Sequence, residues 1–254
     1  MIQLVSSLLA STARQWRGTS ALIRDEQPHA MLTLYDMEGC PYCRPVREAL
    51  TELDLDVLIK PCPKGQAGYW DELEQLSGTR RVPFLVDPNN GHQVTESKAI
   101  IAYLHTQYGK GQLPRSSESL KLSQLASALR LAKGTRGRPS WAPQTPLELY
   151  SFESSPFSRL VRERLTELGL AYVLRNCGKQ QLSDAGLPWL RPGKGPYRPV
   201  PGTNRARLMK QTGKVQLPYL YDPNTHTGLF ESSDIIRYLQ QQYGDASTQQ
   251  GTAQ

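Results

Sequence analysis

The sequence predicts an α/β protein built from two tandem copies of one domain. Residues 34–55 align without gaps on residues 149–170, and 13 of these 22 positions are identical. A second block, residues 82–109, matches residues 217–244 at 14 of 28 positions. The offset between the copies grows from 115 to 135, so the second copy carries an insertion of 20 residues. A period of this size indicates domain duplication rather than a short-period solenoid.

Each copy shows the same order of expected elements. In the first copy these are strands over 32–36 and 56–60, helices over about 41–53 and 69–76, a strand ending at Asp87-Pro88-Asn89, its antiparallel partner, and a helix over 97–108. Their counterparts in the second copy include 147–151, 156–168, 171–175 and 232–243. A βαβ opening requires a right-handed crossover and parallel pairing. The expected topology of each copy is therefore β-α-β-α-β-β-α.

Two cysteines mark the first strand-to-helix turn, in the tetrapeptide Cys40-Pro41-Tyr42-Cys43. Free backbone N–H groups and the helix dipole favour an anion at this place, which lowers the pKa of a thiol. This predicts Cys40 as a nucleophile and Cys43, one turn inside the helix, as the thiol that resolves a mixed disulfide. Arg44 and Arg47 add positive charge nearby, although arginines in a first turn are more often solvated.

A zinc site is the competing interpretation of two cysteines at this spacing. A structural zinc site needs four ligands, usually including a second close pair. The other two cysteines, Cys62 and Cys177, stand alone, and the four histidines lack ligand spacing. The sequence therefore favours a redox site and predicts no metal.

Both copies resemble thioredoxin-fold domains of the glutaredoxin and glutathione S-transferase N-terminal type. The motifs that carry the resemblance are CPYC, Val82-Pro83 and the run from Glu96 to Ile100. The resemblance implies glutathione as co-substrate, bound beside Tyr42. It also implies a cis Pro83 opposite the redox turn, a backbone contact from Val82 to the cysteinyl part of glutathione, and a γ-glutamyl site at Glu96 and Ser97, where a helix N-terminus binds the carboxylate.

The second copy departs from this pattern at the turn itself. Ser155 and Ser158 replace the two cysteines, so thiol exchange at this turn is excluded. The pairs Leu217-Pro218 and Glu231-Ser232 remain as a possible second glutathione cradle. Two interpretations stay open: Ser155 activates a glutathione thiol, as a serine does in some glutathione transferases, or the second domain is structural, which we favour.

Cys62 and Cys177 occupy equivalent places after the second strand of each copy. In the expected topology this end of the strand lies beside the redox turn. Cys62 is then either a third thiol near bound glutathione or a small apolar packing residue. Its counterpart in the serine-containing copy favours packing.

The expected domain organisation has five parts. These are an N-terminal helical extension over 1–30, a first domain over 31–109, a linker with an amphipathic helix over 110–145, a second domain over 146–244 with a basic insertion at about 187–212, and a disordered tail over 245–254. The linker helix is expected over 116–131. We expect the N-terminal helix to dock through its apolar residues, Ile2, Leu4, Val5, Leu8 and Leu9. No all-helical transferase domain follows the first domain, so the usual pocket for an electrophile lacks walls.

The chain has 254 residues and a net charge of +7. Much of the charge lies in residues 187–216, which hold seven basic residues and no acidic one. This run can attract an anionic partner, but glycines and prolines interrupt it and no nucleic-acid-binding motif accompanies it. We expect a mobile, solvated loop and no nucleic acid partner. The order of charges argues against an export signal, and no stretch is long enough to span a membrane. We therefore expect a cytoplasmic protein without a membrane partner. The sequence leaves the oligomeric state open.

The predicted function is glutathione-dependent thiol-disulfide exchange on protein disulfides or glutathionylated proteins, with Cys40 attacking and Cys43 resolving. One alternative is a transferase-like enzyme in which Cys40 or Ser155 works on bound glutathione. Another is a non-catalytic glutathione-binding adaptor. A third, less favoured, is a dimer that bridges an iron–sulfur cluster through Cys40 and glutathione.

Overall fold

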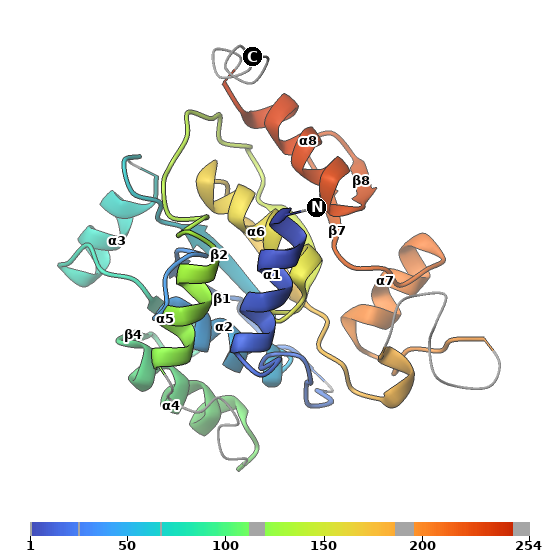
Figure 1. Cartoon of the computed structure of the whole chain (residues 1–254). Coiled ribbons are helices and arrows are strands. Elements are labelled where there is room, and N and C mark those ends of the chain that lie inside the picture. The colour runs from blue at the N-terminus through green and yellow to red at the C-terminus, as the bar shows by residue number, and fades with distance from the viewer. Residues whose placement is uncertain (1, 25, 67, 112–119, 186–195, 246–254) are drawn as a thin grey trace.

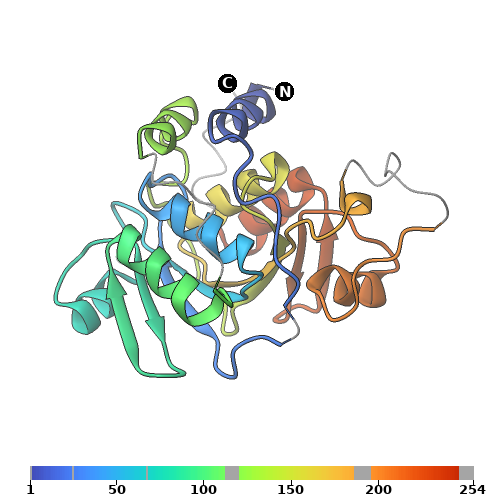
Figure 2. The ribbon, with the colours of Figure 1, turned by 90° about the horizontal axis from the view of Figure 1, so that it is seen from below.

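The structure is a computed structural model that describes residues 2–24, 26–66, 68–111, 120–185 and 196–245. Its eight described strands form one mixed sheet in the order β4-β3-β1-β2-β6-β5-β7-β8, with helices packed around it (Figures 1 and 2). The predicted disordered tail lies almost wholly outside the described residues, as does the first part of the predicted linker helix.

The first repeat has the predicted topology. Its elements are β1 (Leu32–Asp36), α2 (Cys43–Glu52), β2 (Val57–Pro61), α3 (Trp70–Ser77), β3 (Phe84–Asp87), β4 (His92–Thr95) and α4 (Ser97–Tyr108). Strand β1 pairs in parallel with β2 and antiparallel with β3. The α/β prediction is therefore confirmed, and helix α2 begins two residues later than expected.

The second repeat follows the same plan with one addition. Its elements are β5 (Leu147–Ser151), α6 (Pro156–Glu167), β6 (Tyr172–Asn176), the 3₁₀ turn η1 (Leu182–Asp184), α7 (Asn204–Thr212), β7 (Tyr219–Asp222), β8 (Thr227–Phe230) and α8 (Ser232–Tyr243). Helix α7 holds the place of α3, so the extra residues lie between β6 and α7. The expectation of a solvated loop was wrong for 204–212, where Arg205 is buried and donates to the Cys177 carbonyl at 3.0 Å. Residues 186–195 lie outside the described part.

The two repeats share one sheet and one core. Strand β2 pairs antiparallel with β6, with Leu58 opposite Val173. The main apolar cluster includes residues from both repeats, among them Leu50, Leu85, Leu165 and Leu220. The sequence did not predict this pairing of β2 with β6, which makes the two domains one body.

A buried network of charges also joins the repeats. Arg47 donates to Asp36 at 2.7 Å and to Glu153 of the other repeat at 3.0 Å. Arg162, which is the counterpart of Arg47, donates to Glu38 across the same boundary at 3.0 Å. The expectation that the arginines at the start of α2 are solvated was wrong, because Arg47 is fully buried.

Two further helices, α1 (Ile2–Ala13) and α5 (Leu120–Leu129), lie side by side (Figure 1). Each of them contacts the turn of the repeat that it does not precede. Helix α1 precedes the first repeat but contacts the turn of the second, where Ser7 Oγ donates to the Pro156 carbonyl at 2.8 Å. Helix α5 precedes the second repeat but contacts the turn of the first, where Ser123 Oγ donates to the Pro41 carbonyl at 2.6 Å.

The N-terminal helix docks by a different face from the one predicted. Its buried positions are Ser7, Ala10 and Ser11, whereas Val5, Leu8 and Leu9 are exposed. Leu4 is half-buried, and the side chain of Ile2 lies outside the described part. Small side chains allow α1 to approach the turn closely enough for the serine hydroxyls to reach backbone carbonyls, which explains the inversion.

Candidate active site

The Cys40 turn is held by the linker that follows α5. The Gly39 N–H donates to the Gly134 carbonyl at 3.1 Å. A Cβ atom on Gly39 would lie 2.5 Å from the Lys133 carbonyl oxygen and 2.5 Å from Thr135 Cγ2. Glycine is therefore required at position 39 for this close approach. Together with the Ser123 contact, these bonds fix the backbone on both sides of Cys40.

The two thiols of the turn differ in exposure and acidity. Cys40 is partly exposed and Cys43 is fully buried. The pKa of Cys40 is lowered to about 7, chiefly by a hydrogen bond from the Cys43 side chain. Burial of Cys40 opposes this shift, and the backbone N–H groups of Cys43 and Tyr42 add to it. Burial raises the pKa of Cys43 well above its ordinary value. Cys43 is the first residue of α2 rather than one turn inside it.

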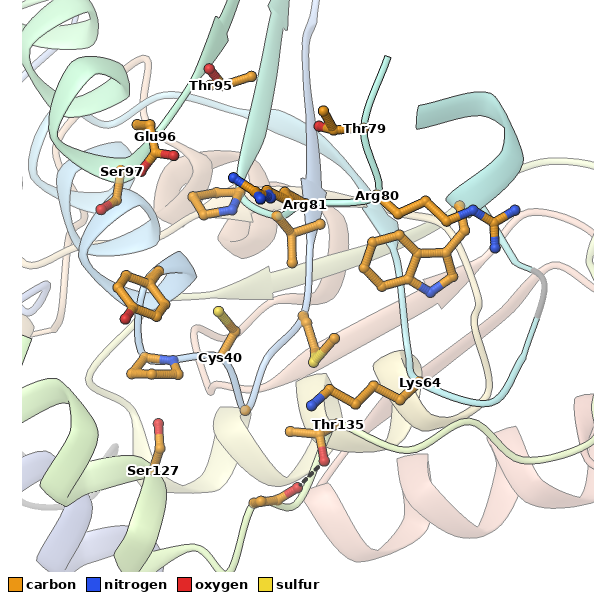
Figure 3. Close-up of a pocket in the computed structure, with 18 of the residues that line it drawn as sticks. Cys40, Lys64, Thr79, Arg80, Arg81, Thr95, Glu96, Ser97, Ser127 and Thr135 are labelled. Atoms are coloured by element: carbon orange, nitrogen blue, oxygen red, sulfur yellow. Dashed lines mark hydrogen bonds between the residues drawn. The ribbon is translucent and has the colours of Figure 1, made fainter. Parts of the chain in front are cut away.

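Cys40 opens into a cavity of about 940 Å³ (Figure 3). All the residues of the first repeat that were predicted to bind glutathione line this cavity with Cys40: Tyr42, Val82, Pro83, Glu96 and Ser97. Figure 3 shows Glu96 and Ser97 on one side of Cys40, with Arg80 and Lys64 on the other. Residues from the turn, from the segment before β3 and from the start of α4 thus line one cavity with this thiol.

The backbone of this cavity offers free hydrogen-bonding groups. The Val82–Pro83 peptide bond is cis, as expected. Among the described residues, the N–H and C=O of Val82 have no hydrogen-bond partner in the protein. Glu96 precedes α4 with φ of 69°, and its side chain does not cap the helix. The Glu96 side chain therefore leaves the N-terminus of α4 uncapped, and a helix N-terminus favours an anion.

The opposite side of the cavity comes from residues that the sequence analysis missed. Lys64, Trp70 and Arg81 line it, and α5 with its following loop closes it through Ser127 and Ala132. The expectation that the usual pocket for an electrophile lacks walls therefore does not hold for this side of the turn, where the linker helix lines the cavity. The linker helix supplies a wall in a chain for which no separate helical domain was expected.

The turn of the second repeat has a different geometry. Ser155 is 3% exposed, and its Oγ accepts a hydrogen bond from the Ser158 N–H at 3.2 Å as the N-cap of α6. Ser158 is fully buried. The Leu217–Pro218 bond is cis, but the Glu231 carboxylate accepts from Gln216 and Ser232 begins α8. The serine that replaces Cys40 is thus engaged with its own helix.

The remaining cysteines are buried packing residues. Cys62 lies in a cluster with Tyr35, Leu73 and Phe84, and Cys177 lies in the equivalent cluster of the second repeat. Burial raises the pKa of both thiols. Neither Cys62 nor Cys177 lines the cavity beside Cys40. Across the described ranges, no group of three or more His, Cys, Asp or Glu side chains is arranged to hold a metal ion.

The β-α-β-α-β-β-α repeat, with a cysteine pair at its first turn and a cis proline opposite, defines a thioredoxin-fold protein. The family model of the glutathione S-transferase N-terminal domain matches residues 34–114 and again residues 149–247. The chain therefore belongs to this family and carries its domain twice. No curated protein matches the chain. Membership supports a glutathione-related function of the oxidoreductase or transferase type. Within the described part, no helix has the length and apolar character needed to cross a membrane.

Proposed function

We propose that the first repeat is a glutathione-dependent thiol-disulfide oxidoreductase. The observation that carries this proposal is the position of Cys40, whose pKa of about 7 makes it about half thiolate at neutral pH, in one cavity with Val82, Glu96 and Ser97. We propose a reducing compartment such as the cytoplasm, where a cysteine pair at this spacing is more often catalytic than structural.

The reaction divides between the two thiols according to their acidity. The Cys40 thiolate attacks one sulfur of a disulfide, and the other sulfur leaves as a thiolate that takes up a proton. With a protein disulfide, the Cys43 thiol loses its proton and attacks the mixed disulfide, which releases the product and forms a Cys40–Cys43 disulfide. One glutathione thiolate reopens that disulfide, and a second attacks the resulting glutathionyl mixed disulfide. Two glutathione molecules become one oxidised glutathione, so the electrons balance.

Glutathione fits the polarity of the cavity. Its cysteinyl part can pair with the free N–H and C=O of Val82, which places the sulfur near Cys40. The γ-glutamyl carboxylate can accept from the N-terminus of α4 and Ser97, with Glu96 available for the ammonium group. The glycyl carboxylate then lies toward the cationic side of the cavity, where Arg81 is exposed.

Three variants test this proposal. Cys40→Ser is expected to abolish glutathione-dependent reduction of both protein disulfides and glutathionylated peptides. Cys43→Ser is expected to lose only the reduction of protein disulfides, because removing glutathione from a peptide needs a single thiol. Arg81→Ala is expected to raise the KM for glutathione about tenfold, since a charged hydrogen bond contributes about 1.5 to 3 kcal/mol. Arg237→Ala, at an exposed position of α8, is the matched control. Full activity in Cys40→Ser would refute the proposal.

A second candidate is a transferase reaction in which glutathione bound near Cys40 attacks an electrophile. The wall formed by α5 favours this reaction, because the cavity that it encloses extends beyond the predicted glutathione site. Ser155 is a poor candidate for the same chemistry, since it is buried and caps its own helix. Thioether formation with a small aromatic chloride, retained in Cys43→Ser, would favour the transferase reaction.

A further inference from the structure

Helix α1 is amphipathic, but it buries its small polar face and exposes its apolar face. Its buried positions, Ser7, Ala10 and Ser11, continue into Arg14 directly after the helix with the i, i+3, i+4, i+7 spacing of one helix face. The apolar residues Val5, Leu8 and Leu9 lie on the opposite face and are exposed. A helix that buries serines and exposes leucines has its apolar face directed away from its own protein.

Helix α5 repeats this arrangement. Residues 4–19 align on 120–135, with identical residues at 8 of 16 positions. Ser123, Ala126 and Ser127 are buried, whereas Leu125, the counterpart of Leu9, is 49% exposed. Leu131, directly after α5, is 85% exposed.

The two exposed faces adjoin. The helices are neighbours in Figures 1 and 2, and they run antiparallel, because Arg130 after the end of α5 donates to the Gln3 carbonyl in the first turn of α1 at 2.7 Å. We define the apolar face of α1 and α5 by Val5, Leu8, Leu9, Leu125 and Leu131. Exposed patches of this kind mark protein or membrane interaction sites.

The two helices and the segments directly after them carry no acidic side chain of their own. The sequence has no acidic residue before Asp25 and none from Leu120 to Leu147. Lys121 is exposed one helical turn before Leu125, and Arg136 is exposed in the loop that follows. Two copies of this chain, each with a net charge of +7, would bring like charges together around such a contact. An anionic surface would instead be attracted.

We infer that the apolar face of α1 and α5 docks on the surface of an anionic phospholipid bilayer. The leucines enter the boundary between headgroups and acyl chains, and the basic residues contact lipid phosphates, as in interfacial amphipathic helices. The expectation of no membrane partner rested on the absence of a spanning segment, and peripheral docking needs none. Because Ala128 of α5 lines the Cys40 cavity, docking holds that cavity close to the bilayer.

Co-sedimentation of the full chain with lipid vesicles tests this inference. We expect binding to phosphatidylcholine vesicles that contain about one third phosphatidylglycerol, little binding to pure phosphatidylcholine, and release at about 0.5 M salt. Leu9→Ala and Leu125→Ala each remove three carbon atoms from a half-exposed side chain. Each is expected to weaken binding about tenfold, and the double variant about a hundredfold.

Leu182→Ala is the matched control, because Leu182 is 86% exposed on η1 in the second repeat. Unchanged thermal unfolding and unchanged glutathione-dependent turnover in the double variant would show that its effect is on docking alone. Absence of binding to anionic vesicles, or undiminished binding of the double variant, would overturn the inference. A dimer in sedimentation equilibrium that the double variant abolishes would overturn it in favour of a second copy.

Discussion

The buried charge network between the repeats predicts that substitutions of two arginines on one helix change the free energy of unfolding by very different amounts. Arg44 and Arg47 are both on α2 and both buried. Arg47 bonds Asp36 and Glu153 at 2.7 and 3.0 Å. Arg44 lies 4.0 Å from Glu153, and its Nε and Nη1 have no hydrogen-bond partner among the described residues. Arg47→Met leaves buried carboxylates unpaired, which costs about 3 to 5 kcal/mol. Arg44→Met removes a charge that is poorly compensated, so we expect a change within about 1 kcal/mol.

Equilibrium unfolding in urea measures this difference. Tryptophan fluorescence and circular dichroism give the midpoint for each variant. With a dependence of about 3 kcal/mol per molar urea, Arg47→Met should lower the midpoint by about 1 to 2 M, whereas Arg44→Met should move it by about 0.3 M or less. Equal midpoints for the two variants, or a larger loss in Arg44→Met, would refute the view that the network holds the repeats together.

Three further predictions concern single positions. Burial, helped by Asp56, raises the pKa of Asp54 to about 7 in the folded state, so the folded protein loses stability as pH rises from about 4 to 7. Asp54→Asn should therefore stabilise the protein by about 1 to 3 kcal/mol at pH 8 and little at pH 4, as thermal unfolding at both pH values will show. Gly39→Ala should displace the linker loop and lower stability by about 1 to 3 kcal/mol in urea unfolding, with a parallel loss of turnover. Replacing Ser155 and Ser158 by cysteines in the Cys40→Ser background should not restore disulfide reduction in a turnover assay, because the turn of the second repeat is buried; restored turnover would show that its geometry is not the obstacle.

The topology of each repeat could be predicted because the chain contains its own second copy. A pattern that occurs in both residues 34–55 and residues 149–170 is a stronger indication of secondary structure than a pattern seen once. The strands at Leu32–Asp36 and Leu147–Ser151 were predicted with the bounds observed. The cavity residues Val82, Glu96 and Ser97 came from the family resemblance, and they line one cavity with Cys40.

The docking of α1 could not be predicted from hydrophobic periodicity. Hydrophobic periodicity predicts that a helix buries its apolar face, whereas Ser7 and Ser11 are buried here because their hydroxyls bond turn carbonyls. A signal was present in the alignment of residues 4–19 on 120–135, which shows that each repeat begins with its own helix. The exchange of these helices between the repeats is a long-range arrangement that no local pattern encodes.

The buried arginines also escaped prediction, since charged residues in a first turn are usually solvated. The useful signal was identity between the copies: Arg47 matches Arg162, and Glu38 matches Glu153. These four residues form the network that joins the repeats, in which burial would raise the pKa of Glu153 but the guanidinium groups of Arg162 and Arg47 hold it at about 2.

The proposed role of Cys40 as the attacking thiol can be tested by following the reaction of the reduced protein with oxidised glutathione as a function of pH. Each turnover should convert the Cys40 and Cys43 thiols into a disulfide and release two molecules of glutathione. We expect the rate to rise with pH to a plateau with a midpoint near 7, the pKa of Cys40, and we expect Cys40→Ser not to react. A midpoint near 9, or release of glutathione by Cys40→Ser, would contradict it.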